Sequence, residues 1–308
     1  MEYPPQIGGI ATYLAGEVRD HGDVQIIRAQ DTFWDKWPVW LPLAWTIRDQ
    51  FRRHGRDSLW VSHVLPIGYI AYVWKLLFDV PYRVYVHGLD LVLPARSPWK
   101  GFWVRRILLS ADEIVANSNA TAKILSRYSI DPGRARISYP KIRKISTEDY
   151  SALGNELREK YHLAHKPILL TISRLIRRKG ISFVIRALHE VWKRIPGLVY
   201  VVVGDGEERH ALESLAKNNS RIILVGAVSE DEKYAWLSAC DCFILTPIED
   251  PFDFEGYGIV YKEAQQFGKP VIGSTVGGVP EAIGNDGALV EQGNSEEIAR
   301  TIVKAMGQ

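Results

Sequence analysis

The chain has 308 residues and a mass of 34.9 kDa, a length that suits two domains of about 150 residues each. Its 46% hydrophobic and 24% charged residues are ordinary for a folded globular protein, and they exclude a disordered, collagen-like or coiled-coil chain. The two cysteines, Cys240 and Cys242, can form neither a disulfide framework nor a zinc site, so we expect two small buried residues.

The net charge of +2 is unevenly distributed, because residues 1–150 are net positive and residues 151–308 are net negative. Most of the ten tryptophans also lie in the first 150 residues, so we expect the two halves to bind different ligands. The first residues lack the basic start and apolar stretch of a signal peptide, and the apolar run at residues 64–74 is too short to span a bilayer. We therefore expect a cytoplasmic protein that at most lies on the inner membrane face.

The first half mixes apolar runs that resemble strands with segments at helical spacing. Strands are predicted at residues 24–28, 58–62, 83–87 and 113–116, and helices at 9–21, 42–54, 66–78, 98–109 and 119–127. Residues 141–150 are polar, charged and without periodicity, which is typical of a linker. We therefore expect one domain at residues 1–145 and a second at residues 146–308.

The second half alternates regularly between the two kinds of segment. Strands are predicted at residues 167–172, 198–203, 221–225, 242–245, 271–273 and 288–290, and helices at 181–195, 207–217, 231–239, 258–267 and 295–306. Because these strands are continuously apolar rather than alternating, they indicate a parallel sheet that is buried on both faces. The sequence therefore predicts an α/β, doubly wound domain here and a similar domain in the first half.

A cationic turn follows the predicted strand 167–172. Residues 173–180 include three arginines and a lysine, placed between the carboxyl end of that strand and the start of a helix. Ligands gather at this edge of an open α/β sheet, and a helix N-terminus also attracts anions. A diphosphate would be bound there by charge-assisted hydrogen bonds, whereas a solvated basic turn is the alternative interpretation.

Two glutamates, Glu255 and Glu263, lie eight residues apart where a loop enters the predicted helix 258–267. Eight residues of helix make about 2.2 turns, so we expect both carboxylates on roughly one side, where they can accept hydrogen bonds from sugar or ribose hydroxyls. Gly256 and Gly258 would let backbone N–H groups approach an oxygen-rich ligand. Acidic residues also favour a helix start without any ligand, which explains Glu255 but not the glycine spacing.

Three further motifs are weaker on their own. Residues 204–206, Gly-Asp-Gly after a strand, lack the third glycine of a dinucleotide fingerprint and are interpreted as a tight turn. Residues 277–281, Gly-Gly-Val-Pro-Glu, could form a loop that faces a phosphate. His87 closes a predicted strand before Gly88, so it could hydrogen-bond a substrate or move a proton, with a structural histidine as the alternative.

Taken together and in chain order, these motifs resemble the family 4 retaining glycosyltransferases. The resemblance rests on residues 255–264, 268–272 and 277–281, on 173–180 and 204–206, on His87 with Gly88, and on the opening residues 4–9. It implies the GT-B fold, in which two Rossmann-like domains face each other across a cleft. The acceptor side comes first in the chain and the nucleotide-sugar side second.

The resemblance also implies a role for individual residues. Arg174 and Lys179 would neutralise the diphosphate of the donor. Glu263 would bind the nucleotide ribose and Glu255 the hydroxyls of the donor sugar, while His87 would contact that sugar near the reaction centre. The other donor-binding residues would be Gly8, Gly9, Gly204, Asp205, Gly256, Tyr257, Gly258 and Ile259.

The implied reaction transfers a hexose from a UDP-, GDP- or ADP-sugar to a hydroxyl of a glycan or glycolipid, with retention of the anomeric configuration. No cofactor or metal is expected, because a fixed cation about 4 Å from the leaving diphosphate is worth roughly 4 kcal/mol at an effective dielectric constant of about 20. A sugar-nucleotide epimerase or a phosphorylase of the same fold, or an inactive sugar-nucleotide-binding fragment, is the alternative. Nucleic-acid binding is not expected, because no basic stripe is interleaved with aromatic residues.

Two features go beyond these motifs. Family members begin with an apolar strand before the Pro-Pro and Gly-Gly pairs and continue past the last helix seen here, so we expect a truncated chain without the first strand of its N-terminal domain. Residues 33–56 and 99–106 are rich in Trp and Arg, which suits an anionic membrane surface, a protein core or a sugar acceptor. Peripheral contact with an anionic membrane and a lipid-linked acceptor are therefore hypotheses.

Overall fold

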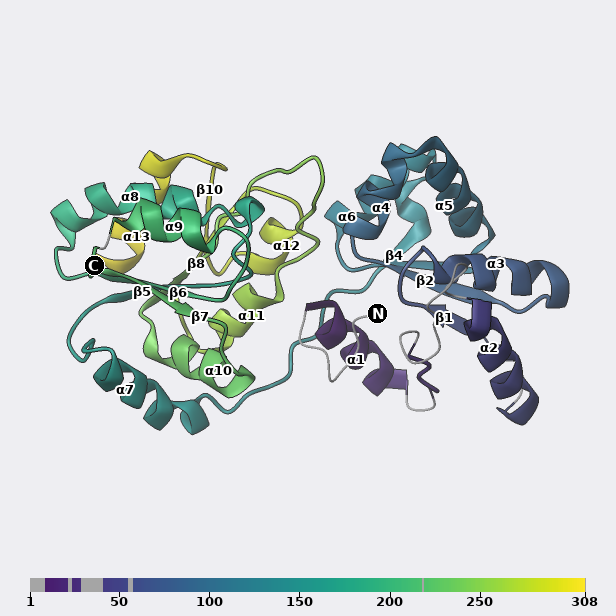
Figure 1. The fold of residues 1–308 in the computed structure, drawn as a ribbon, viewed down its shortest axis with the longest axis horizontal. Coiled ribbons are helices and arrows are strands. Elements are labelled where there is room, and N and C mark those ends of the chain that lie inside the picture. The colour runs from purple at the N-terminus through teal and green to yellow at the C-terminus, as the bar shows by residue number, and fades with distance from the viewer. Residues whose placement is uncertain (1–8, 22–23, 29–40, 55–57, 218, 308) are drawn as a thin grey trace. The chain divides into compact units, whose positions relative to one another are not determined.

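The computed structural model describes residues 9–21, 24–28, 41–54, 58–217 and 219–307, which form two compact units. The first unit comprises Met1–Ile142 and the later segment Pro251–Tyr257, and the second comprises Arg143–Asp250 and Gly258–Gln308. Each unit has its own parallel sheet and its own core (Figure 1).

The first unit is built on four parallel strands in the order β1-β2-β3-β4. These strands are Leu59–Val61, Tyr82–Val86, Glu113–Ala116 and Ala135–Ile137. The helices are α1 Gly9–His21, α2 Leu41–His54, α3 Ile67–Phe78, α4 Leu89–Val92, α5 Pro98–Ser110 and α6 Asn119–Lys123. In Figure 1, α4, α5 and α6 lie on one side of this sheet and α1 and α2 on the other.

The core of the first unit lies between the sheet and α5. The buried residues Val104, Ile107 and Leu108 recur at the three- and four-residue spacing that places them on one side of a helix. They belong to the same buried cluster as Val84 and Val86 of β2. The other residues of α5 are half-buried or exposed.

The second unit is built on six parallel strands in the order β10-β9-β8-β5-β6-β7. The strands β5 to β10 are Ile168–Ile172, Val199–Val203, Ile222–Gly226, Cys242–Ile244, Val271–Ser274 and Ala288–Val290. The helices α7 to α13 are Ser151–Lys160, Ile181–Arg194, Arg209–Ala216, Glu230–Ala239, Ile259–Gln266, Val279–Ile283 and Ser295–Met306. Figure 1 shows α8, α9 and α13 on one face of this sheet and α7 and α10 on the other.

The buried parallel sheet predicted for the second half is confirmed. Every residue of β6 is buried, as continuously apolar strands between two helix layers require. Helix α8 buries a stripe of apolar residues against this sheet and against α13, namely Ile181, Val184, Ile185, Leu188 and Val191. Cys240 and Cys242 are buried and unpaired by a disulfide, as expected, and burial raises the pKa of the Cys240 thiol to about 12.

Some predicted elements are wrong or incomplete. Residues 24–28 form no strand, and Ile26 is 45% exposed, so β-branched composition alone did not create a strand without a neighbour to pair with in the described chain. The predicted helix 119–127 ends early and continues as the 3-10 helix Ile124–Tyr128. Strand β4 and helices α4, α7 and α12 were not predicted, because three to ten residues carry little periodicity.

Glycine allows the loops at the carboxyl edge of the second sheet to pack backbone against backbone. Gly204, after β6, has a φ of +131°, and a Cβ there would lie 1.9 Å from the carbonyl oxygen of Ser173, after β5. A Cβ at Gly180 would lie equally close to the carbonyl oxygen of Thr246, after β8. The loops that leave three neighbouring strands are therefore held against one another.

The Gly204→Ala substitution should lower the free energy of unfolding by about 3 kcal/mol or more, because it adds steric overlap to an unfavourable φ. Gly268→Ala is the matched control, since its φ is +65° but a Cβ would meet nothing within 4 Å. That variant should lose only about 1–2 kcal/mol. Urea unfolding measures both values, and equal losses would contradict the close packing of the two loops.

Candidate functional site

The cationic turn follows β5, the strand at which the second sheet reverses its order. Ligands of open α/β sheets bind outside the carboxyl ends of the strands at such a switch point. Arg174 is exposed, Lys179 is half-buried at the end of the 3-10 turn Arg177–Lys179, and Arg178 is only 5% exposed. The turn leads into the N-terminus of α8, so two predicted diphosphate-binding cations precede a helix start.

Backbone hydrogen bonds fix the path of this turn. The N–H of Ile248, after β8, donates to the carbonyl of Arg178 at 2.8 Å, and the N–H of Leu175 donates to the carbonyl of Asp205 at 2.9 Å. The carboxylate of Asp205 accepts from the N–H of Gly206 at 2.8 Å and lies 3.8 Å from the guanidinium of Arg209. The predicted donor-binding residues Gly204 and Asp205 thus have structural roles in the turn.

Helix α11 begins at the same edge of the second sheet. Gly258 precedes it with a φ of +90°, and a Cβ there would lie 2.5 Å from the ring of Tyr261. The hydroxyl of Tyr261 donates to the carbonyl of Leu245, just after β8, at 2.7 Å. Helix α11 starts at Ile259, so the backbone N–H groups of its first turn, which have no partner within the helix, lie at this edge of the second sheet.

Glu263 lies on α11 and is 7% exposed. Its carboxylate accepts a hydrogen bond from the ammonium of Lys233, on α10, at 2.7 Å. Burial of a carboxylate is tolerated when a cation partners it, and its remaining lone pairs can still accept from a hydroxyl. No local pattern pointed to Lys233, because thirty residues separate it from Glu263.

The expectation that Glu255 and Glu263 share one side of a helix is wrong. The helix begins only at Ile259, four residues after Glu255, because the positive φ of Gly258 cannot continue an α-helix. Glu255 is 7% exposed and belongs to the segment Pro251–Tyr257, which is part of the first unit.

This segment packs on the carboxyl edge of the first sheet. A Cβ at Gly256 would lie 2.4 Å from the carbonyl oxygen of His87, after β2, and Ser118, after β3, donates its hydroxyl to the carbonyl of Gly256 at 2.6 Å. The ring of Phe254 fills the space where a Cβ at Gly88 would stand. The structure therefore brings the predicted residues His87, Glu255 and Gly256 to one sheet edge.

The other predicted residues lie as follows. The ring of Tyr257 lies 5.6 Å from that of Tyr139, after β4, in the first unit. Gly9 is exposed and begins α1, and Gly8 lies outside the described residues.

His87 is 6% exposed, and its Nε2 lies 2.9 Å from the carbonyl oxygen of Ser62. Because a carbonyl oxygen only accepts, Nε2 carries the proton and Nδ1 is left as an acceptor. The edge of the Tyr13 ring lies against the imidazole with ring centres 5.5 Å apart. Burial lowers the pKa of His87 to about 4, although the Ser62 carbonyl opposes the shift, so the ring is neutral near pH 7.

Sequence reasoning missed two partners of His87. The carboxylate of Asp90 accepts from the backbone N–H groups of His87 at 2.9 Å and of Gly88 at 3.0 Å, an arrangement that Asp three residues on could have indicated. The ring of His63, after β1, lies 5.3 Å from that of His87, and burial lowers the His63 pKa to about 4. These contacts orient the turn from which the His87 ring projects.

The described residues contain neither a metal-binding cluster nor a helix that could cross a membrane. No three His, Cys, Asp or Glu side chains in that part of the chain come together as a metal ion would require. Of the described helices, none has the length and apolar character needed to cross a bilayer. Metal independence stays a prediction.

Two family models match the chain. The model described as "Glycosyltransferase Family 4" matches residues 10–142, and the model described as "Glycosyl transferases group 1" matches residues 166–308. The two matches include all the sequence motifs described above except the opening residues 4–9.

Curated relatives share this similarity over most of the chain. The GDP-mannose-dependent alpha-(1-6)-phosphatidylinositol monomannoside mannosyltransferase of Mycobacterium tuberculosis is 31% identical over 275 residues, covering 84% of this chain and 69% of the relative. The protein of the same name from Mycolicibacterium smegmatis is 31% identical over 343 residues, covering 98% of this chain and 86% of the relative.

Solved structures show the same fold. HepE of Anabaena, crystallised with UDP, aligns with a TM-score of 0.74 at 19% identity over 95% of this chain and 79% of HepE. WaaG, a glycosyltransferase involved in lipopolysaccharide biosynthesis, aligns with a TM-score of 0.67 at 17% identity over 99% of this chain and 89% of WaaG. These likenesses confirm the predicted fold class, two Rossmann-like domains of the GT-B type.

Stability should fall as the pH decreases from about 6.5 toward 4. His63 and His87 titrate near 6.5 when unfolded but have a folded pKa of about 4, so the unfolded state takes up the extra protons in this range. Each histidine contributes at most about 1.4 kcal/mol per pH unit. Urea unfolding between pH 5 and pH 6.5 measures how the free energy of unfolding changes with pH. Asp90 makes a contribution of opposite sign, because burial raises the pKa of its carboxyl group.

The variant His63→Gln/His87→Gln should therefore show a flatter dependence on pH, whatever its stability at pH 7. His210→Gln, at a histidine whose side chain is 96% exposed, should keep the wild-type slope. An unchanged slope in the double variant would contradict the neutral, buried state of the two rings.

Proposed function

Because this chain belongs to the family 4 glycosyltransferases, we propose that it transfers a hexose from a nucleotide sugar to a hydroxyl of a lipid-linked glycan, with retention of the anomeric configuration. The observation that carries the proposal is the cationic turn at the switch point of the second sheet, beside the start of α11 and the buried Glu263. The named relatives use GDP-mannose and act on phosphatidylinositol mannosides, so GDP-mannose is the first donor to test.

The second unit supplies groups suited to the nucleotide diphosphate. The leaving diphosphate gains negative charge in the transition state, where fixed cations such as Arg174 and Lys179 stabilise it most. The N-termini of α8 and α11 add partial positive charge at the same sheet edge. Glu263, held by Lys233, accepts hydrogen bonds from the ribose hydroxyls in this proposal.

The first unit supplies groups suited to the donor sugar. In this proposal Nδ1 of neutral His87, a buried acceptor without a hydrogen-bond partner among the described residues, accepts from a sugar hydroxyl, while its low pKa makes His87 a poor general acid near pH 7. Glu255, next to Gly256 at the same edge, adds a carboxylate acceptor. In the proposed reaction the acceptor hydroxyl attacks from the side of the leaving group, which retains the configuration without a covalent intermediate on the protein.

Arg174→Ala and Lys179→Ala should each remove most of the thermal stabilisation by GDP-mannose. A ligand at 100 times its dissociation constant adds about 2.7 kcal/mol to the stability of the wild type, and loss of one phosphate contact should weaken binding by about tenfold or more. A thermal-shift series with GDP-, UDP- and ADP-sugars measures the effect and identifies the donor.

Arg177→Ala is the matched control, since it removes an exposed cation from the same turn. It should keep most of the stabilisation. An equal loss in all three variants would show that the turn attracts the donor only through its net charge, and would contradict specific roles for Arg174 and Lys179. No loss in Arg174→Ala or Lys179→Ala would contradict the diphosphate assignment.

Turnover should survive removal of divalent metal, because the two cations stabilise the diphosphate in the proposed mechanism. The assay measures GDP release and glycolipid formation from GDP-mannose and a phosphatidylinositol mannoside in EDTA, and NMR gives the anomeric configuration of the product. Activity abolished by EDTA and restored by Mn²⁺ would contradict the metal-free mechanism. An inverted product would contradict retention, and an epimerised sugar nucleotide without GDP release would contradict transfer.

A further inference from the structure

The outer side of α3 is apolar where a surface helix ordinarily carries polar residues. Leu76 and Leu77 are 64% and 67% exposed, and Val73 and Phe78 are each 47% exposed. The helix contains no acidic residue, and its single cation, Lys75, is held by Asp112 at 2.7 Å. The other side of α3 is buried in the first unit. The exposed apolar residues therefore do not contribute to the protein core.

Helix α5 extends this apolar surface. The ring of Trp103 contacts Tyr69 and Tyr72 of α3 at centre distances of 5.7 and 6.2 Å, and it contacts Trp99 and Phe102 at 5.8 and 5.5 Å. Trp99 is 67% exposed and Phe102 50% exposed. The exposed residues of both helices and the rings that join them form one continuous surface, which we call the α3–α5 face.

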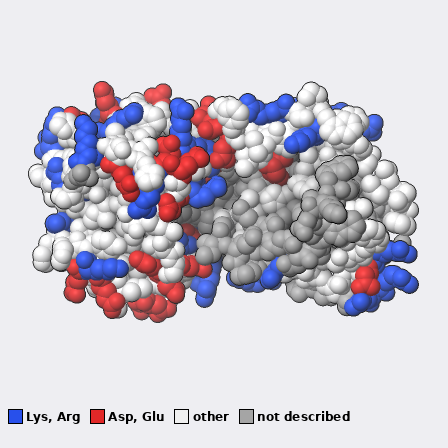
Figure 2. Space-filling view, viewed as in Figure 1, with Lys and Arg blue, Asp and Glu red and all other residues white. Residues whose placement is uncertain are grey.

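The charges on the α5 side of this face are positive, whereas at the end of α3 the cation Lys75 lies between the acids Asp79 and Asp112. Helix α5 carries Lys100, Arg105 and Arg106, each exposed, and residues 91–111 contain no acid. The guanidinium of Arg106 lies over the ring of Phe102 at 5.5 Å. Figure 2 shows basic and uncharged side chains along the upper edge of the first unit, where Figure 1 places α5.

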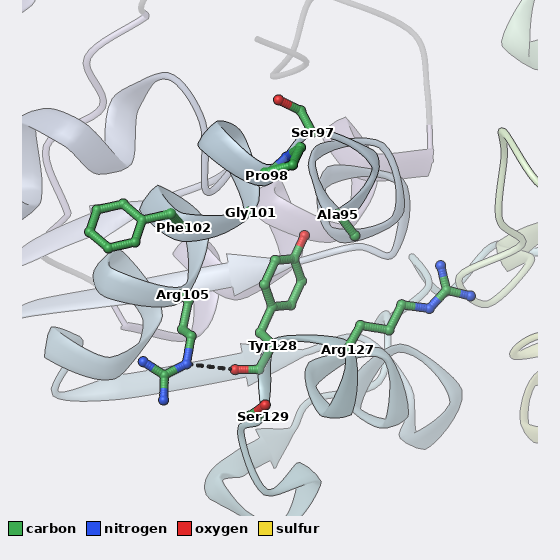
Figure 3. A pocket seen from close by; sticks show the side chains of 9 residues that line it. All are labelled: Ala95, Ser97, Pro98, Gly101, Phe102, Arg105, Arg127, Tyr128 and Ser129. Atoms are coloured by element: carbon green, nitrogen blue, oxygen red, sulfur yellow. Dashed lines mark hydrogen bonds between the residues drawn. The ribbon is translucent and has the colours of Figure 1, made fainter.

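A pocket of about 220 Å³ opens beside Phe102. Arg105 lines it, and its Nε donates to the carbonyl of Tyr128 at 3.0 Å (Figure 3). Arg127 and the hydroxyl-bearing residue Ser97 line the same pocket. A cationic, hydroxyl-lined hollow next to exposed aromatic rings matches a lipid head group above its acyl chains.

We infer that the α3–α5 face docks on a membrane of anionic phospholipid. Leu76, Leu77 and Trp99 enter the boundary between head groups and acyl chains, while the cations of α5 meet the phosphates. A second copy of this chain fits less well, because a two-fold contact between identical faces would place the same cations opposite one another. The inference rests on the proposed function in one respect, because a lipid-linked acceptor requires the enzyme to reach a membrane.

Sedimentation with vesicles tests the inference. The wild type should bind vesicles of phosphatidylcholine with phosphatidylglycerol at low salt, and it should bind vesicles of phosphatidylcholine alone far more weakly. Leu76→Glu/Leu77→Glu and Lys100→Glu/Arg106→Glu should each lower the partition coefficient by roughly tenfold or more. The melting temperature of each variant confirms that it is folded.

Two matched controls change the same kinds of residue elsewhere. Ile26→Glu/Leu289→Glu places two charges on other exposed apolar residues, and Arg300→Glu/Lys304→Glu reverses two exposed cations on α13. Both should bind vesicles nearly as the wild type does. Equal losses in the controls, or no vesicle binding by the wild type, would overturn the docking face.

Two further measurements separate this inference from other outcomes. A wild-type dimer that Leu76→Glu/Leu77→Glu dissociates in sedimentation velocity, without vesicle binding, would show a protein interface instead and overturn the inference. Thermal stabilisation by a nucleotide sugar without vesicles should be the same in the wild type and both docking variants. Vesicle binding without any nucleotide-sugar stabilisation would support the docking face while contradicting the proposed function.

Discussion

Close backbone contact between the loops at the carboxyl edge of the second sheet is the constraint on which the proposed donor site depends. At Gly204 a Cβ would overlap the carbonyl of Ser173, so this position holds the loop after β6 directly against the loop after β5. The cationic turn 173–180 consequently leaves the sheet along one path, with Arg174 exposed and Arg178 buried. The same cations on an unconstrained loop would form only a solvated basic turn.

His87 and Glu263, at the edges of the two sheets, each have a defined partner, which limits what each can offer to a ligand. The Ser62 carbonyl sets the tautomer of His87, and Lys233 neutralises Glu263. A buried polar group without such a partner costs about 1–3 kcal/mol, so the fold itself selects these arrangements. As a result, His87 presents an acceptor rather than a titrating acid, and Glu263 presents a carboxylate already oriented by an ammonium.

The tryptophans of the first half lie in different environments, which explains why composition alone could not choose between a protein core, a sugar acceptor and a membrane surface. Trp74 is 7% exposed and packs in the core with α2, whereas Trp99 is 67% exposed. Trp60 lies beneath the guanidinium of Arg83 at 4.7 Å. Residues 33–40 lie wholly outside the described chain, so the membrane hypothesis now rests chiefly on α3 and α5, while Trp45 on α2 is also 53% exposed. Helix α3 was not singled out in the sequence, because an apolar helix is ordinarily assigned to the core.

By itself, the sequence determined the regular elements and the order of the motifs, because helical and strand periodicity are local properties. It located the cationic turn at the end of β5 and His87 at the end of β2 to within a residue. Only the tertiary structure assigned Pro251–Tyr257 to the first unit, paired Lys233 with Glu263 and exposed the apolar side of α3. Ser118 and Gly256 are 138 residues apart, and no local pattern encodes a contact that forms only when both parts of the chain have folded.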